Sequence, residues 1–419
     1  MSSSEPSSSD EEEISESESS SDEGWDLIYP WDETLESIKE NDPDVKLIQP
    51  DGEDIQDMID EEWKELGRDI ASNTHLTKVK LSQGALNDHK MSCLFRGLTR
   101  STSIKEMGLY GNQLSAAGVR SMVPFLQNAN SLRELDLDDN NLQTEGFNVL
   151  LRALSDSPIK SLRVKRCGVE SVDIEKEHIP RQLKYLYLES NIINADGCRG
   201  LATLLQGGDA KLERLDLNRN KIDDDGVEIL VNALKNNVSL GELYLLQNDA
   251  ISRRGKISLL KLVNDISSID ATLRSNHTLT HLYTIDAGLD RHFGLAMEIN
   301  MGNRSNTEAA GREKVIETQL HSKRRAELAV LQGVNHSVYS EIDPLHLPEV
   351  LALVALHNGQ GELYIALRSS IAGVISTVNR KECLKQQRAD LKARLEAIQA
   401  EIATIDAELV TIEAAEEHS

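Results

Sequence analysis

Five of the chain's eight tyrosines lie in one stretch of the sequence where their spacing suits contact with a partner molecule. A tyrosine side chain joins a large apolar ring to a hydroxyl group, and it is favoured in protein–protein interfaces. The five residues are Tyr110, Tyr185, Tyr187, Tyr244 and Tyr283. The chemistry that they offer is noncovalent recognition of a protein.

Two groups of charged residues of opposite sign lie between Tyr110 and Tyr185 in the sequence. The acidic group contains Asp136, Asp138 and Asp139, and the basic group contains Arg163, Lys165 and Arg166. Either the two groups pair with each other, or they form a bipolar surface that suits a partner of mixed charge. We expect Asp136, Asp138, Arg163, Lys165 and Asp216 to contact the partner together with the five tyrosines.

The sequence lacks the motifs that usually position catalytic groups. It has no phosphate-binding loop, dinucleotide fingerprint, nucleophile elbow or zinc-binding His-Glu-x-x-His motif. The eleven histidines are scattered without ligand spacing. The acidic run at residues 223–225 falls where a helix should begin, and acids are favourable there. We therefore expect a protein that is not an enzyme and has no cofactor and no metal.

A repeated phrase supplies the elements that would position the contact residues. The pattern L-x-x-L-x-L-x-x-N is intact five times and ends in Asn112, Asn140, Asn191, Asn220 and Asn248. Weaker copies begin at Leu76, Ile159 and Leu279, and the second of them places Cys167 where the asparagine would stand. A spacing of about 28 residues is typical of leucine-rich repeats that contain a strand and a full α-helix.

The second half of each repeat has the pattern of an amphipathic helix. A glycine stands six residues after the asparagine in four repeats, and apolar residues follow it at +1, +4, +5 and +8, as in Val227, Leu230, Val231 and Leu234. Two repeats depart from this pattern. The return segment at 171–180 is too short for a full helix, and about eleven extra residues lie near 266–275. Either departure is a functional protrusion or a tolerated insertion.

Stacked repeats of this kind predict an α/β solenoid over residues 76–290, with about eight repeats. Its parallel strands line the inside of a horseshoe arc and its helices cover the outside. The asparagines and Cys167 should turn inward and form a hydrogen-bonded ladder between repeats. The residue between the last two leucines of each phrase, and the residue after them, should point to the concave face. Four of the tyrosines and Asp136, Asp138, Arg163, Lys165 and Asp216 lie at such positions, and Tyr185 lies on the same strand as Tyr187.

The repeat length, the asparagine or cysteine position and the glycine-led helix resemble the ribonuclease-inhibitor-like class of leucine-rich repeats. That class includes the repeat domains of Ran GTPase-activating proteins and of NOD-like receptors. The resemblance covers about residues 76–290 and implies the fold. The shared motifs are all structural, so no catalytic residue is carried over.

The N-terminal region is strongly acidic. Residues 1–66 hold 24 acidic and 3 basic residues, so most of the net charge of −25 lies there. We expect residues 1–54 to be a disordered head and residues 55–75 to form a helix that caps the first repeat. The aromatic cluster around Trp25 and Trp31 either docks on the protein or binds a partner. The acidic head could also occupy the basic group as an autoinhibitory segment.

The C-terminal region has helical patterns without the repeat. We expect residues 291–380 to form a helical cap or bundle, with helices at about 312–331, 348–358 and 363–378. Residues 381–419 carry heptads of apolar residues from Leu384 to Ile412 and predict a coiled-coil helix. Its basic residues come early and its acidic residues late, so the segment 384–412 should pair in antiparallel fashion, within or between chains.

These features together indicate a scaffold that binds a protein partner on the concave face. Two alternatives are a small-GTPase regulator and a chaperone that binds basic proteins through the acidic head. The acidic composition argues against nucleic acid as a partner. We expect no membrane association, because the apolar stretches are too short and no signal peptide is recognised. The expected location is the cytoplasm, with the nucleus as an alternative.

Overall fold

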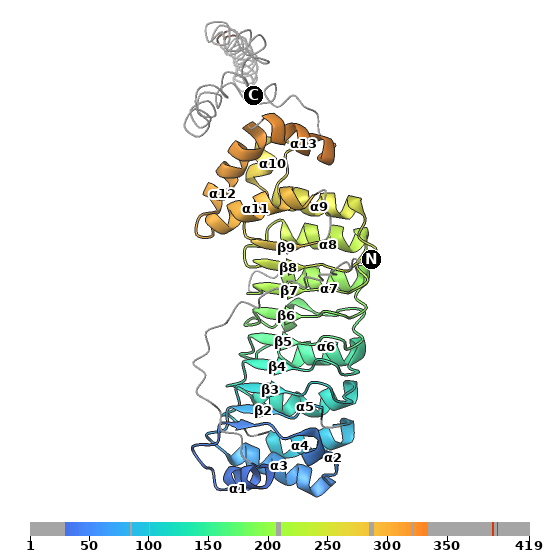
Figure 1. The fold of residues 1–419 in the computed structure, drawn as a ribbon, viewed down its shortest axis with the longest axis vertical. Coiled ribbons are helices and arrows are strands. Elements are labelled where there is room, and N and C mark those ends of the chain that lie inside the picture. The colour runs from blue at the N-terminus through green and yellow to red at the C-terminus, as the bar shows by residue number, and fades with distance from the viewer. Residues whose placement is uncertain are drawn as a thin grey trace, which may run out of the picture.

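The computed structural model describes residues 30–83, 86–99, 101–206, 211–284, 289–320 and 322–333, together with Arg388 and Lys392. Within these residues, nine short strands form one parallel sheet in which the strand order follows the sequence. The strands stack along one side of the molecule and the helices along the other (Figure 1). This arrangement confirms the predicted alternation of strand and helix.

Each repeat contributes one strand of three residues, and neighbouring strands pair in register. The middle residues, from Val79 in the first repeat to Leu282 in the last, lie side by side and are buried. The first and third residues of each strand point to the opposite side of the sheet, because side chains alternate along a strand. The strands are β1 (Leu47–Ile48), β2 (Lys78–Lys80), β3 (Glu106–Gly108), β4 (Glu134–Asp136), β5 (Ser161–Arg163), β6 (Tyr185–Tyr187), β7 (Arg214–Asp216), β8 (Glu242–Tyr244) and β9 (His281–Tyr283).

The helices of the repeats bury the apolar stripe that the sequence indicates. In the sixth repeat Val227, Leu230 and Leu234 are fully buried, and Asp223 caps the helix by accepting a hydrogen bond from the backbone N–H of Gly226. The fourth repeat has only one short 3₁₀ turn, η1 (Lys176–His178). The helices are α4 (Asp88–Leu98), α5 (Ala116–Asn128), α6 (Gln143–Ala153), α7 (Ala195–Gln206), α8 (Asp224–Leu234) and α9 (Arg253–Val263).

The five asparagines that end the repeat phrase are buried and join successive repeats. In Asn191 the Nδ2 atom donates to the carbonyl of Val164 in the preceding repeat (2.8 Å) and to that of Leu188 (3.0 Å). Its Oδ1 atom accepts hydrogen bonds from the N–H groups of Cys167 and Val169, both at 3.0 Å. Similar side-chain bonds bring Asn112, Asn140, Asn220 and Asn248 into the ladder.

Cys167 stands at the asparagine position of the fourth repeat and also makes an inter-repeat bond. Its Sγ atom donates to the carbonyl of Leu137 at 3.1 Å. Burial raises the pKa of the Cys167 thiol to about 12, and burial raises the pKa of Cys198 to the same value. A thiol with such a pKa is almost entirely protonated at neutral pH and is therefore a poor nucleophile.

The N-terminal region differs from the sequence expectation. Residues 30–54 are not disordered, because they form α1 (Trp31–Lys39), β1 and the start of α2 (Gly52–Gln56). Ile38, Val45 and Ile48 from this segment are buried in the core. The prediction of disorder was based on the high local charge and gave too little weight to these few apolar residues. They are enough to fix the segment against the first repeat. Residues 1–29 lie outside the described residues.

The expected helix at 55–75 is interrupted. Helix α2 ends at Gln56, and α3 (Asp60–Ser72) begins after a short turn. The carboxylate of Glu62 accepts a hydrogen bond from the N–H of Ile59 at 2.8 Å. This bond stabilises the turn and caps the N-terminus of α3. As a result Ile59, assigned to the apolar stripe from its spacing, is 64% exposed.

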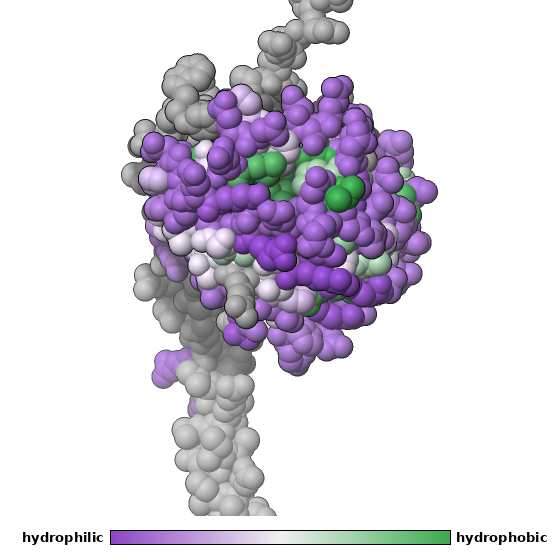
Figure 2. Space-filling view, turned by 90° about the horizontal axis from the view of Figure 1, so that it is seen from below, coloured by the Kyte–Doolittle hydropathy of each residue, from purple (hydrophilic) through white to green (hydrophobic). Residues whose placement is uncertain are grey.

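Helix α3 covers the first repeat, as a solenoid cap must. It lies very close to α4, because Gly67 and Gly97 meet at the contact. A Cβ atom added to Gly97 would lie 2.5 Å from the backbone nitrogen of Arg68. Trp63 and Leu66 from α3 are buried, and the end face outside them is mainly hydrophilic (Figure 2). The N-terminal cap therefore consists of α1, β1, α2 and α3 rather than one helix.

Four further segments cap the other end of the solenoid. They are α11 (Asp290–Gly302), α12 (Thr307–Lys314), the π-helix η2 (Val315–Leu320) and α13 (Ser322–Gln332). The expected helix at 312–331 is thus divided. The helices expected at 348–358 and 363–378 lie outside the described residues. So does the heptad segment 381–419, except that Arg388 and Lys392 are helical.

The extra residues near 266–275 serve this C-terminal cap. They form the short helix α10 (Ile269–Leu273). The side chain of Gln332 accepts a hydrogen bond from the N–H of Ile266 (3.1 Å), and that of Gln319 donates to the carbonyl of Ser268 (3.0 Å). The insertion is therefore a platform on which the C-terminal segments pack rather than a free protrusion.

A buried lysine holds the cap to the repeats. The Nζ atom of Lys314 donates to the carbonyl oxygens of Val263 (2.6 Å) and Asn276 (3.2 Å), and it lies 3.1 Å from Nδ1 of His277. Nε2 of His277 in turn donates to the carbonyl of Leu273, so the ring is neutral with Nδ1 as acceptor. Burial lowers the pKa of Lys314 to about 7 and, with the nearby lysine, that of His277 to about 4.

We expect Lys314 to make the folded protein more stable as the pH rises above 7. Above pH 7 the folded chain loses a proton from Lys314 that the unfolded chain keeps until about pH 10.5, so stability should rise with pH. The expected rise in the free energy of unfolding is about 2 kcal/mol between pH 7 and pH 9. Urea denaturation of the protein and of the Lys314→Met variant measures it. If the free energy of unfolding rose equally with pH in both proteins, Lys314 would not be the group responsible.

Candidate partner-binding surface

The side of the sheet that faces away from the helices carries three rows of side chains. The first and third residues of each strand supply two rows, and the residue two positions after the strand supplies the third. We call this surface, from β2 to β9, the sheet face. It corresponds to the concave face of the sequence prediction. Most of its side chains are partly exposed, whereas the middle residues of the strands are buried.

The acidic and basic groups on the sheet face pair with each other. The guanidinium of Arg163 lies 3.4 Å from a carboxylate oxygen of Asp136 and 3.1 Å from one of Asp138. Lys165 contacts Glu189 at 2.8 Å, and Arg166 pairs with Asp139. Because its cations have internal partners, the basic group offers little free charge to the chain's own acidic head. The structure therefore gives no support to the autoinhibitory alternative.

Asp138 and Asp216 differ from the other predicted contact residues because they are buried, at 3% and 8% exposure. Oδ1 of Asp138 accepts a hydrogen bond from the N–H of Lys165 at 2.6 Å, and Oδ1 of Asp216 accepts one from the N–H of Asn218 at 3.0 Å. Both carboxylates hold the backbone that follows a strand. Their burial leaves little of either carboxylate exposed to a partner.

We expect Asp138 to make stability fall as pH rises through the weakly acidic range. Burial raises its pKa to about 6, although the bond from Lys165 and the charge of Arg163 act in the opposite direction. Between about pH 4 and pH 6 the folded chain binds a proton that the unfolded chain has lost, so stability should decrease by roughly 2–3 kcal/mol. Urea titrations at pH 4.5, 5.5 and 6.5 should show this decrease in the protein but not in Asp138→Asn.

Strands β7 to β9 carry a stack of aromatic and basic side chains. The rings of Tyr244 and Tyr283 are stacked with centroids 4.6 Å apart, and the ring of His281 stacks on Tyr283 at 6.0 Å. The guanidinium of Arg214 lies 5.8 Å from the centre of the Tyr244 ring on its other side. We call Arg214, Tyr244, Tyr283 and His281 the aromatic ladder.

One acidic residue, Glu242, holds two members of the ladder in place. The hydroxyl of Tyr244 donates to the carboxylate of Glu242 at 2.9 Å, and Arg214 pairs with the same carboxylate at 2.8 Å. Burial raises the pKa of Tyr244, so its hydroxyl remains a hydrogen-bond donor at neutral pH. The outer ring, Tyr283, is 40% exposed. The ladder is therefore a preorganised surface that still has an exposed aromatic ring.

Sequence reasoning found the tyrosines of the ladder but missed Arg214 and His281. Both are the first residue of a strand, a row from which the prediction included only Tyr185. The alternation of side chains along a strand was the signal that would have included them.

The remaining tyrosines occupy other parts of the sheet face. Tyr187 lies beside the charged pairs, with Arg163 and Lys165 at 5.2 Å and 5.5 Å from the centre of its ring. The hydroxyl of Tyr185 is 3.5 Å from the carboxylate of Glu213. Tyr110 follows β3, three strands away from β6, and is not part of this group. The structure thus places Tyr185, Tyr187, Tyr244 and Tyr283 on three strands, β6, β8 and β9, and leaves Tyr110 apart.

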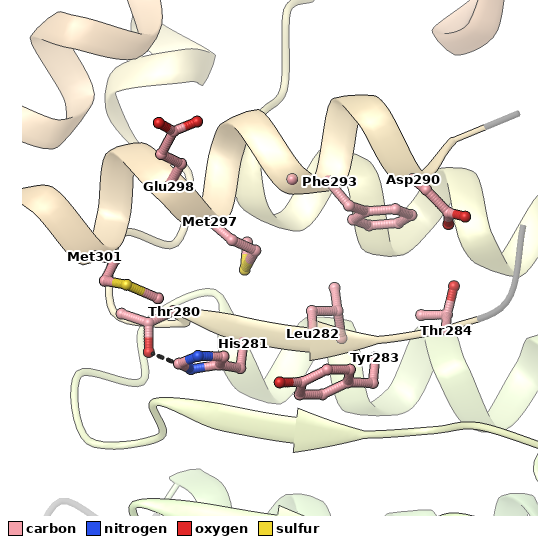
Figure 3. Close-up of a pocket in the computed structure, with 11 residues that line it drawn as sticks. Thr280, His281, Leu282, Tyr283, Thr284, Asp290, Phe293, Met297, Glu298 and Met301 are labelled. Atoms are coloured by element: carbon pink, nitrogen blue, oxygen red, sulfur yellow. Dashed lines mark hydrogen bonds between the residues drawn. The ribbon is translucent and has the colours of Figure 1, made fainter. Parts of the chain in front are cut away.

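A groove adjoins the ladder where the sheet ends. It lies between β9 and α11 and has a volume of about 450 Å³ (Figure 3). Leu282 from the strand and Phe293 and Met297 from the helix form its apolar floor, and Met301 at its rim is 47% exposed. No part of the sequence predicted the groove, because it depends on how the C-terminal cap packs against the last strand.

One group of metal-ligand atoms occurs among the described residues, although the sequence predicted none. Atoms of Asp60, His89 and Cys93 lie within 4.8 Å of one another between α3 and α4. Nε2 of His89 is 2.7 Å from the carboxylate of Asp60, so a hydrogen bond or ion pair accounts for two of the three.

In the part of the chain that the structure describes, no helix has the length and apolar character needed to span a membrane.

Comparison with known proteins agrees with this architecture. A family model described as "Leucine Rich repeat" matches residues 128–147 and 209–231. Ribonuclease inhibitor from Mus musculus is 28% identical over 208 residues, which are 47% of this chain and 45% of that protein. NACHT, LRR and PYD domains-containing protein 5 from Homo sapiens is 26% identical over 54% of this chain and 19% of that protein. The chain thus spans less than half the length of these relatives.

Among solved structures, that of leiomodin-1 actin-binding site 2 aligns with 72% of this chain and 99% of its own, at 13% identity and a TM-score of 0.24. The stacked strand-and-helix units, the family match and the sequence relatives together define the class. The chain contains leucine-rich repeats, and these repeats resemble those of ribonuclease inhibitor and of the NACHT, LRR and PYD proteins.

Proposed function

We propose that this chain is a non-enzymatic interaction protein that binds a protein partner through the aromatic ladder and the adjoining groove. The observation that supports this most is the stack formed by Tyr244, Tyr283 and Arg214. Tyrosine and arginine are the residue types most often found at energetic hot spots of protein interfaces, and a rigid stack loses little entropy when it is covered.

The shape of the surface favours a protein over a small molecule. The ladder lies on an open sheet, whereas sites for small molecules enclose most of their ligand. The groove beside Tyr283 can receive one apolar side chain of the partner, against Phe293 and Met297. One relative is named for the inhibition of ribonuclease, which is itself a protein, so repeats of this type suit protein recognition.

The contact residues that we propose fall into two groups. The centre consists of Tyr244, Tyr283 and Arg214, and the flank consists of Tyr187 with the paired charges of Arg163 and Lys165. Tyr185 and Asp136 lie at the edges of the flank. Paired surface charges contribute little affinity in water, so they should determine orientation and association rate, while the aromatic centre provides most of the binding energy.

Affinity capture with the full chain tests the proposal. The protein, the double variant Tyr244→Ala/Tyr283→Ala and the control Arg199→Ala are each used to capture proteins from an extract of the source cell. Arg199 is an exposed residue of α7 whose ion pair is with Asp196 in the same helix. We expect a set of proteins that the wild type and the control capture and the double variant loses. Identical sets for all three proteins would refute the proposal.

A further inference from the structure

The N-terminal cap contains a second recess, far along the solenoid from the aromatic ladder. It lies between α1, α2 and α3 and has a volume of about 440 Å³. Its floor is apolar, because Trp31, Leu35 and Met58 pack against the core while remaining partly exposed. Figure 2 shows this end of the molecule, where small hydrophobic areas are exposed within a mainly hydrophilic surface.

The wall of the recess is strongly acidic. Six carboxylates line it against one cation, Lys39, and that lysine already pairs with Glu65 at 2.7 Å. Asp54 and Glu62 are also engaged, because each accepts a hydrogen bond from the backbone N–H that precedes its helix. The carboxylates with no hydrogen bond or ion pair to the described residues are Asp32, Asp57 and Asp69.

The electrostatic cost of this arrangement is visible at Asp69. Partial burial raises the pKa of its carboxyl group; the charge of Lys39 offsets part of this rise, and the nearby charge of Glu65 adds to it. Like charges that share a partly desolvated site favour a cation that neutralises them. The side chain that combines an apolar stem with a cationic head is that of arginine or lysine, and such stems pack on apolar surfaces while the head reaches carboxylates.

We propose that this recess binds an arginine or lysine side chain within a basic segment of a partner protein. The stem lies on Leu35 and Met58, the cationic head contacts Asp32, Asp57 and Asp69, and the ring of Trp31 offers a face for a cation–π contact. The site is separate from the aromatic ladder, so the inference does not depend on the proposed function of the sheet face.

Charge complementarity selects this occupant over the chain's own N-terminal segment. Residues 1–29, which lead directly into α1, contain ten acidic residues and no lysine or arginine. A segment of that charge is repelled by six carboxylates. The ten negative charges of that segment add to the chain's overall attraction for a basic partner, which increases its rate of association.

Isothermal titration of the full chain with a nine-residue peptide of alternating arginine and alanine tests the proposal. We compare the pocket variant Asp32→Asn/Asp57→Asn/Asp69→Asn with a control that loses the same charge. The control carries Asp156→Asn, Glu228→Gln and Asp249→Asn, three exposed acids far from the recess. We expect the pocket variant to bind about tenfold or more weakly and the control to bind within about twofold of wild type.

A second variant tests the apolar floor, which a purely electrostatic attraction would not use. Trp31→Ala keeps every carboxylate, and we expect it to weaken binding about tenfold as well. Circular dichroism establishes that each variant is folded. Equal loss in the pocket variant and the control, or unchanged affinity in both the pocket variant and Trp31→Ala, would overturn the proposal, because the attraction would then come from the acidic chain in general.

Discussion

The Tyr244→Ala variant is expected to bind its partner about ten- to a hundredfold more weakly than the wild type. The ring of Tyr244 lies between Tyr283 and Arg214, so its removal also frees both neighbours from the stack. The loss therefore includes the contact itself and the preorganisation of the two residues beside it. Titration of the captured partner by surface plasmon resonance measures the change, which should appear mainly in the dissociation rate.

Two further variants separate the contributions to this loss. Tyr244→Phe keeps the stack and removes only the hydroxyl that donates to Glu242, so its effect should be several times smaller. Arg199→Ala on the helix side should leave the affinity unchanged. If Arg199→Ala weakened binding as much as Tyr244→Ala, the helices rather than the sheet face would carry the interface.

The largest expected effect on stability comes from the asparagine ladder. Asn191→Ala removes two donors and one acceptor, and it leaves the carbonyl of Val164 and the N–H groups of Cys167 and Val169 without these bonds, whereas the carbonyl of Leu188 keeps its bond from Asn220. Buried polar groups that lose their partners cost about 1–3 kcal/mol each, and local relaxation recovers part of this. We expect a loss of about 2–4 kcal/mol in the free energy of unfolding.

Urea denaturation followed by circular dichroism measures this loss. The matched control is Asn232→Ala, an exposed asparagine of α8 whose side chain bonds only to Lys235 in the same helix. Its effect should stay within about 0.5 kcal/mol. A loss at Asn191 no larger than at Asn232 would show that the ladder contributes little to the cohesion of the repeats.

The central fold followed from the sequence because its side chains repeat with a fixed period. Leucines such as Leu215 and Leu243 have no environment but the interior between strand and helix, and they are fully buried. One phrase therefore determined the strand, its register and the direction of its middle side chain. The same reasoning explains the partial success at the candidate site, where Tyr187, Tyr244 and Tyr283 were identified from their place after a leucine.

The caps were harder to predict because they occur once and have no period. The segment 30–54 was assigned to disorder from its charge, yet Ile38 and Ile48 are enough to anchor it. The groove between β9 and α11 depends on the packing of α11, which local sequence does not specify. Asp138 and Asp216 were expected to be exposed but are buried, because the sequence shows which face a residue is on but not how much of its side chain the neighbours cover.

Site-specific photo-cross-linking tests the central claim most directly, namely that the aromatic ladder contacts the partner. The photoreactive amino acid p-benzoylphenylalanine replaces Tyr283 in one form of the full chain and Arg199 in another. We predict that irradiation in the source-cell extract yields a protein adduct from position 283, that excess unmodified chain competes it away, and that position 199 yields none. Adducts from position 199 alone would contradict the account.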